Sequence, residues 1–195
     1  MTDCWNSVTL YGPSAEIERF RRLCIDLPPG SDPQDVSGGW DGYDTYIGFD
    51  GVMPAEPGCN SRRAQGEYAW NYREHAPQPG SWSFAFDTDQ SFPEGVFEDL
   101  AALFPALHFD CDCIDALDDY MGCGWFNPPT GGEPFRQDME VPADYWTGGG
   151  SRKRTPEVDA KHTALVKALL DAAQDADRRS SKFETFVHVL KEVGR

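Results

Sequence analysis

Residues 81–87, Ser-Trp-Ser-Phe-Ala-Phe-Asp, alternate strictly between aromatic side chains and small or polar ones. Because successive side chains of a β-strand point to opposite faces, this order predicts a strand with one buried aromatic face. Residues 91–104 begin with Ser-Phe-Pro-Glu and then carry apolar residues at helical spacing, which predicts a capped amphipathic helix. The chain alternates again from Leu107 to Cys113. Together these segments predict a β-α-β unit with a shared core.

A second unit of the same kind precedes the first along the chain. Residues 5–11 alternate as a strand, residues 14–24 carry an apolar helical stripe, and residues 43–49 are predicted to form the second strand. Residues 67–75 are aromatic and polar, and both a helix and irregular structure fit them. Residues 121–127 are predicted to add a Gly-rich edge strand. The order β-α-β, loop, β-α-β is typical of a ferredoxin-like α+β fold, an antiparallel sheet with both helices on one face.

The chain is expected to divide into three parts. Residues 1–132 would form the ferredoxin-like domain. Residues 133–155 are rich in Pro and Gly and are predicted to be a linker or an extended loop. Residues 156–195 carry two apolar stripes, over residues 156–176 and 180–193, which predict two C-terminal helices. Both stripes need to be covered, and the simplest arrangement packs the two helices on each other and on the sheet domain.

Charge is distributed unevenly along the chain. Residues 1–150 hold 26 Asp and Glu against 7 Lys and Arg, a balance of −19, whereas residues 151–195 hold 7 against 10, and the total is −16. No Lys or Arg occurs between Arg73 and Arg136. A surface this negative repels nucleic-acid phosphates and attracts basic surfaces. We therefore expect no direct nucleic-acid binding, and the simplest role of the charge is to keep the protein soluble.

The sequence also indicates in which cellular compartment the protein is expected. No apolar run approaches the ~20 residues that a membrane-spanning helix needs. The first five residues lack the basic and then apolar order of a secretory signal. Six cysteines without such a signal are typical of reduced thiols in a cytoplasm. We expect a cytoplasmic protein without membrane contact, and the sequence leaves the oligomeric state open.

No group of reactive residues matches a catalytic or metal-binding motif. Cys111 and Cys113 continue an inward strand row, and they lack the C-x₂₋₄-C spacing of structural zinc sites, so they are expected to behave as small apolar residues. His162 lies on an apolar helical stripe and is expected to be a satisfied core histidine or an interface histidine. No G-x-S-x-G elbow or phosphate-binding G-x-x-x-x-G-K-[ST] loop occurs. We expect no metal, no cofactor and no enzymatic activity.

Several short motifs occur in order along the first two thirds of the chain. They are C-W-N-S-V-T-L-Y-G-P at residues 4–13, F-D-T-D-Q-S-F-P at 86–93, F-E-D-L-A-A-L-F-P at 97–105 and M-G-C-G-W at 121–125. In this order they resemble the YubB ferredoxin-like family of conjugative plasmids and phages, over roughly residues 3–132. The resemblance implies the ferredoxin-like fold. The family has no established biochemical activity, so the resemblance implies no catalytic residues, and its usual genomic context implies a role in mobile-element biology.

Charge and resemblance together favour one function, and the aromatic residues favour another. The first is a non-enzymatic mobile-element protein that presents an acidic surface to a basic surface of a host protein, to counter host defence or to mimic nucleic acid. Its expected interaction residues are Asp87, Asp89, Asp110, Asp112, Asp115, Asp118 and Asp119. The alternative is a small-ligand or regulatory domain with an aromatic pocket between the sheet and the C-terminal helices. Its expected pocket residues are Trp40, Trp70, Tyr72, Trp125 and Trp146.

Overall fold

The computed structural model describes residues 3–25, 69–89, 91–115, 120–129, 131, 135–141 and 156–193. Side chains are described in all of these except residues 70, 135–137, 156–159 and 183–193. The strand predicted over residues 43–49 lies outside the described residues, as do Trp40 and Trp146.

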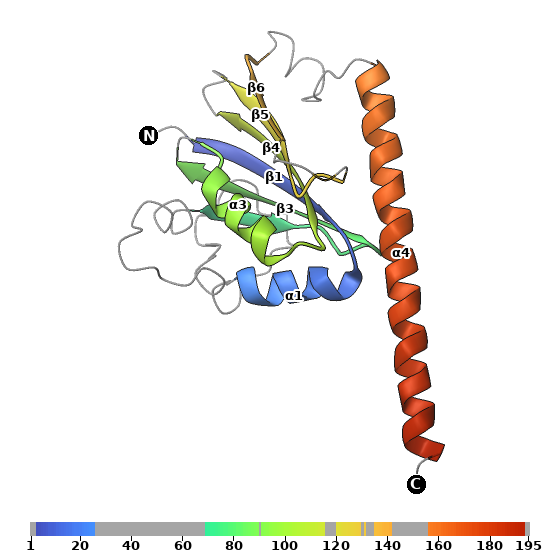
Figure 1. The fold of residues 1–195 in the computed structure, drawn as a ribbon. Coiled ribbons are helices and arrows are strands. Elements are labelled where there is room, and N and C mark those ends of the chain that lie inside the picture. The colour runs from blue at the N-terminus through green and yellow to red at the C-terminus, as the bar shows by residue number, and fades with distance from the viewer. Residues whose placement is uncertain are drawn as a thin grey trace.

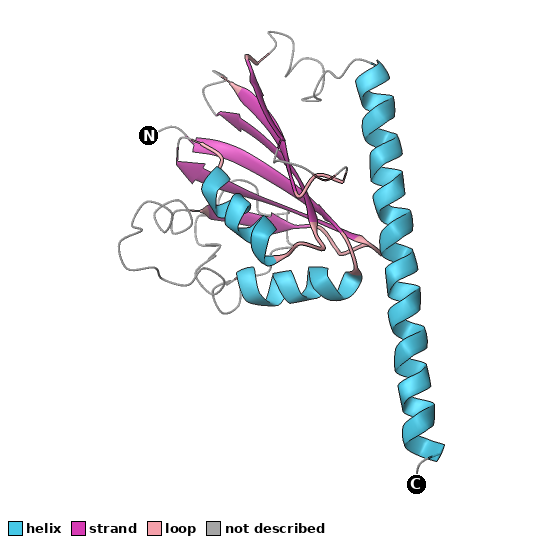
Figure 2. Cartoon of the chain, in the orientation of Figure 1, coloured by secondary structure: helices cyan, strands magenta, loops and turns pink. Residues whose placement is uncertain are grey.

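An open antiparallel sheet forms the centre of the protein (Figures 1 and 2). Its six strands within the described residues follow the order β2-β3-β1-β4-β5-β6, and every neighbouring pair is antiparallel. The prediction of an α+β protein with an antiparallel sheet is confirmed. The strands are β1 (Asp3–Tyr11), β2 (Trp70–Glu74), β3 (Ser81–Asp89), β4 (His108–Asp115), β5 (Met121–Phe126) and β6 (Phe135–Met139).

Three helices are described, and they lie on different sides of the sheet. The helices α1 (Ser14–Cys24) and α3 (Glu94–Leu103) cover one face, where both contribute to the core. The long helix α4 (Pro156–Val193) passes beside the end of the sheet at which β1 finishes and β3 begins (Figure 1). None of the described helices combines the length and the apolar composition that a bilayer crossing requires.

The core lies between the sheet and the helices α1 and α3. Trp82, Phe84 and Phe86 of β3 are at most 1% exposed and belong to one buried cluster with Ile17, Phe20 and Leu100 of the two helices. The Phe20 ring lies at its centre, with ring contacts to β3, to β4 and to Phe104, the residue that follows α3. Aromatic pairs in such arrangements stabilise a core beyond the area that they bury. The shared core predicted from the two periodicities is confirmed.

Two corrections concern the strands after β4. The segment predicted as a Gly-rich edge strand is β5, but it is not an edge, because β6 pairs with its residues 121–125. The strand β6 lies inside residues 133–155, which were predicted to be a linker or extended loop. The strand described between α1 and β3 is β2, in the segment 67–75, where the sequence predicted a helix or irregular structure and not a strand.

The C-terminal region is one helix and not the two that were predicted. The gap that we placed between residues 176 and 180 interrupts the apolar stripe, but the helix contains no Gly or Pro after Pro156. Backbone hydrogen bonds continue a helix through charged residues, and Pro is tolerated at a first helical position. Residues 178–182 are exposed. The apolar stripe is therefore interrupted where the helix extends beyond the sheet.

Two close contacts fix α4 against the end of the sheet. Ser14 donates hydrogen bonds from its backbone nitrogen and its hydroxyl to the carboxylate of Asp177, at 3.0 and 2.6 Å. The carboxylate of α4 therefore satisfies a free N–H at the beginning of α1 and lies at the positive end of that helix. Gly80, in the turn before β3, lies so close to Ala173 that a Cβ on Gly80 would be 2.9 Å from the alanine Cβ.

Candidate functional site

The register of the sheet places four of the predicted acidic residues on one face. Trp5, Ser7 and Thr9 of β1 point away from α1 and α3, and we call the sheet face that they share the open face. Asp87 of β3 is the partner of Trp5, and Asp89 lies two residues further along the same strand. Asp112 and Asp110 of β4 are the partners of Ser7 and Thr9. These four carboxylates therefore belong to the open face.

Asp87 and Asp110 each lie close to a polar side chain of a neighbouring element. Asp87 is 2% exposed and accepts a 2.8 Å hydrogen bond from the amide of Asn71. Burial raises the pKa of Asp87, and the Asn71 hydrogen bond and the Arg73 charge oppose this effect. Asp110 lies 2.9 Å from the His162 ring of α4. His162 is thus an interface histidine, one of the two roles that its place on the apolar stripe predicted.

The remaining carboxylates differ in exposure. Asp89 and Asp112 are half-buried on the open face. Asp115 is 4% exposed and is the partner of Cys4 on the helix-covered face, so the sheet separates it from the others. Asp118 and Asp119 lie outside the described residues. The sequence interpretation missed Asp3, an exposed acid whose partner across the sheet is Asp89.

A hollow of about 360 Å³ lies on the open face. Its lining includes the Trp5 side chain, Ser7 at the centre of the sheet, and the carboxylates of Asp87 and Asp112. Arg73 of β2 lines the same hollow. The hollow therefore combines an aromatic wall with two acids and one base.

The structure does not bring the described members of the predicted aromatic pocket together. Tyr72 lies in the core beside Phe84, and its hydroxyl donates a 2.9 Å hydrogen bond to Glu74. Trp125 stacks on Tyr11 at the open face and lies beside His162. Three strands, β3, β1 and β4, separate β2 from β5, so Tyr72 and Trp125 share no pocket.

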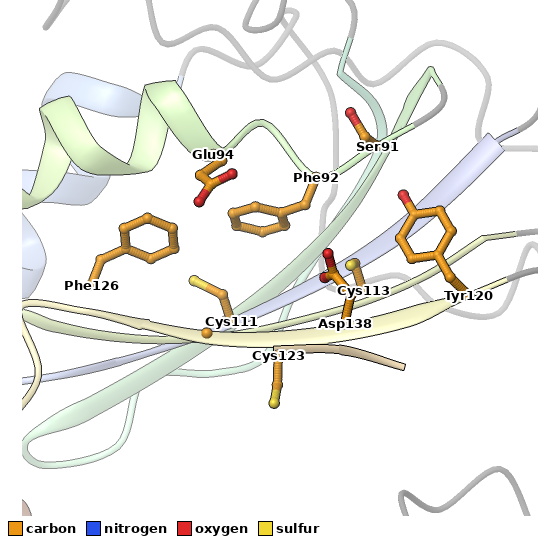
Figure 3. A pocket seen from close by; sticks show the side chains of 11 residues that line it. Ser91, Phe92, Glu94, Cys111, Cys113, Tyr120, Cys123, Phe126 and Asp138 are labelled. Atoms are coloured by element: carbon orange, nitrogen blue, oxygen red, sulfur yellow. The ribbon is translucent and has the colours of Figure 1, made fainter. Parts of the chain in front are cut away.

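A second hollow lies on the helix-covered face, between β4, β5 and the turn that leads into α3 (Figure 3). Its volume is about 260 Å³. Space exists there because Gly122 and Gly124, the partners of Cys113 and Cys111, have no side chains. Stacked Phe92 and Phe126 rings form its apolar side. Its polar side is formed by Ser91, Glu94, Cys113, Tyr120 and Asp138. We call this hollow the β4–β5 pocket.

Buried polar side chains lie next to the polar side of the β4–β5 pocket and are hydrogen-bonded to one another. Asn6 is 3% exposed, and its amide donates to the backbone oxygen of Cys4 at 2.9 Å and to the hydroxyl of Thr88 at 2.8 Å. Thr88 in turn donates to the backbone oxygen of Ser91 at 2.7 Å. The Cys4 thiol donates to the side-chain oxygen of Asn6 at 3.5 Å. This chain of hydrogen bonds links the start of β1 to the Ser91 wall of the pocket.

Within the part of the chain that the structure describes, no three His, Cys, Asp or Glu side chains are grouped so that they could hold a metal ion. Comparison with known proteins finds no matching family model, no matching curated protein and no matching solved structure.

Proposed function

We propose that this protein is a non-enzymatic interaction module that docks a basic surface of another protein against the open face of its sheet. The observation that carries the proposal is the coincidence of acids and a hollow on that face. Asp89 and Asp112 are half-buried there, Asp3 is exposed, and the Trp5 hollow lies between the strands that carry them. A recessed acidic face has a lower local dielectric constant than an exposed one, which strengthens its attraction for cations.

The acidic arrangement itself supports a docking role. Asp3 and Asp89 are direct partners across β1 and β3, and like charges in that position destabilise a sheet. The fold gains nothing from this pair, whereas a basic partner would neutralise it. An aromatic wall such as Trp5 also favours Arg and Lys side chains through cation–π contact, which is worth about 0.5–2 kcal/mol.

We further propose a ferredoxin-like fold and a relation to the YubB family. The strand order β2-β3-β1-β4, antiparallel throughout, together with α1 after β1 and α3 between β3 and β4, supports the split β-α-β arrangement. In this proposal β5 and β6 extend the ferredoxin-like sheet at one edge. A mobile-element protein of this kind would use the open face to occupy a host protein that normally binds nucleic acid or acts in defence.

A matched pair of double variants tests the docking proposal. Asp89→Asn with Asp112→Asn removes two charges from the open face, whereas Asp171→Asn with Asp175→Asn removes two from exposed positions on α4. The probe is a fluorescent arginine decapeptide, followed by anisotropy. Two lost charges are expected to weaken binding about 5- to 30-fold for the open-face variant, at ~0.5–1 kcal/mol each.

The salt dependence of binding provides the second arm of this test. Binding to the unmodified protein should weaken markedly between about 50 and 200 mM salt, because screening shortens the reach of the charges. The same two variants then serve as baits in host lysate to identify the natural partner. Equal weakening in both double variants would contradict docking at the open face.

A second candidate function is binding of a small ligand in the β4–β5 pocket. The specific observation is a hollow of about 260 Å³ with one apolar side and one polar side, a composition that is common in ligand sites. A thermal-shift screen of metabolites and nucleotides tests it, because a ligand bound at 100 times its Kd stabilises the folded state by ~2.7 kcal/mol. A panel without any stabilising compound would count against this function.

A further inference from the structure

Two cysteines that are far apart in the sequence lie on adjacent strands, and one of them, Cys113, lines the β4–β5 pocket. Cys4 is the second residue of β1, and its partner on β4 is Asp115, while Cys113 is the partner of Asn6. The two cysteines are therefore diagonal neighbours on adjacent strands and point to the same face. Their thiols are hydrogen-bonded to each other.

The thiols of Cys4 and Cys113 differ in their exposure to the pocket, and the two other cysteines of β4 and β5 have different surroundings. Cys4 is completely buried, whereas Cys113 is half-buried and lines the pocket. Cys111 lies in the hydrophobic core at 2% exposure, and burial raises the pKa of its thiol well above the usual value. Cys123 lies on the opposite side of the sheet from Cys113 (Figure 3). Among the described cysteines that line the pocket, Cys113 is thus the one that lies next to the buried thiol of Cys4.

The surroundings of Cys4 favour its reactive form. The hydrogen bond with Cys113 lowers the pKa of the Cys4 thiol more than burial raises it, and the Tyr120 hydroxyl lowers it further. The oxygen of that hydroxyl lies 3.8 Å from the Cys4 sulfur. A thiolate is the nucleophile in thiol–disulfide chemistry, and donors of this kind stabilise it.

We propose that Cys4 and Cys113 form a peroxide-reactive thiol pair that closes to a disulfide. The Cys113 sulfur attacks one oxygen of hydrogen peroxide, the O–O bond breaks, and Cys113 becomes a sulfenic acid as one water leaves. The Cys4 sulfur then attacks the Cys113 sulfur, the S–O bond breaks, and the hydroxide takes the proton of Cys4 to leave as a second water. The two thiols are oxidised and the peroxide is reduced. This inference is independent of the proposed docking function.

Closing the bond has a consequence for the pocket. Diagonal residues on antiparallel strands have Cα atoms ~7–8 Å apart, and a disulfide holds them at ~4.4–6.8 Å. The start of β1 must therefore move toward β4 by about 1–2 Å. This movement takes the Cys4 sulfur away from Asn6 and strains the hydrogen bonds from Asn6 through Thr88 to Ser91. Oxidation thus changes the wall of the β4–β5 pocket.

Peptide mapping of the oxidised protein tests the pair. The reduced protein is treated with a small molar excess of hydrogen peroxide, and its remaining thiols are blocked with N-ethylmaleimide. Trypsin would leave the thiols of β4 and β5 on one fragment, because no Lys or Arg occurs between Arg73 and Arg136. A protease that cleaves before Asp separates Cys111 from Cys113, since Asp110 and Asp112 precede them. It is used together with trypsin, which separates Cys4 from Cys24 by cleavage after Arg19, Arg21 and Arg22. We expect a Cys4–Cys113 linked fragment that dithiothreitol removes, and the loss of two free thiols per chain.

Single variants provide the controls. Cys123→Ser should leave the linkage intact, whereas Cys4→Ser should leave a sulfenic acid at Cys113 that dimedone traps. A linkage through any other cysteine, or a Cys4 that stays fully alkylated while Cys113 is oxidised further, would overturn the proposal. The map of the unmodified protein decides the question by itself if a variant does not fold.

Discussion

The turn before β3 provides a quantitative test of how α4 packs against the sheet. Gly80 has a φ of +79°, a left-handed conformation that costs other residues ~1–2 kcal/mol. A Cβ at this position would also lie 2.9 Å from the Cβ of Ala173, and such overpacking costs ~1–3 kcal/mol. We therefore expect Gly80→Ala to lower the free energy of unfolding by about 2–5 kcal/mol.

Gly131 separates the two contributions. Its φ of +69° is similar, but no atom of the residues that the structure describes lies within 4 Å of the position that a Cβ would occupy. Gly131→Ala should therefore cost only the backbone strain, ~1–2 kcal/mol. Urea unfolding followed by circular dichroism measures both variants under the same conditions. The difference between them, about 1–3 kcal/mol, reports the contact between the turn and α4.

A second substitution on α4 completes the test. Ala173→Gly removes the methyl group that would meet the new Cβ, and in a helix it costs ~1 kcal/mol by itself. In combination with Gly80→Ala, it should recover part of the loss, which a double-mutant cycle measures as a coupling energy. Equal losses for the two glycine variants together with no coupling would refute the packing of α4 described above.

Two further predictions concern charged groups in and near the core. Glu74→Ala removes the carboxylate that accepts hydrogen bonds from Arg21 and Tyr72, at 2.7 and 2.9 Å, and should lower the free energy of unfolding in urea by ~2–3 kcal/mol. Glu16→Ala removes an exposed ion pair with Arg19 and should lower it by less than ~0.5 kcal/mol. Similar losses would contradict the role of burial. Because burial raises the pKa of Asp87, the folded protein keeps this proton to a higher pH than the unfolded chain, so the free energy of unfolding should fall as pH rises above ~3.9. Asp87→Asn should remove this contribution, so that the curves of the two proteins separate as pH rises above ~3.9, and parallel curves would contradict the assignment.

The core could be predicted from the sequence because its signals are local. The alternation from Ser81 to Asp87 and the stripe that contains Phe20 each place apolar side chains on one face. Two such faces have to cover each other, and they do so in one cluster. The inward position of Cys111 follows from the same alternation and is also confirmed.

The candidate sites could not be predicted in full because they depend on pairing across strands. Asp87 and Asp89 have the same place in the sequence alternation, yet Asp87 is buried and hydrogen-bonded to Asn71 of β2. The nearness of Cys4 and Cys113 follows from the register between β1 and β4, which no local pattern encodes. The strand β6 carries no strong alternation and forms by pairing with β5.

The charge of the open face can be separated from the stability of the fold. The core lies on the other face, and the partners Asp3 and Asp89 repel each other across β1 and β3. Asp89→Asn should therefore leave the free energy of unfolding unchanged or raise it by up to ~1 kcal/mol, while it weakens binding of the arginine peptide. A variant that lost stability and binding together would show that these acids serve the fold. Retained stability with reduced binding would assign them to the partner.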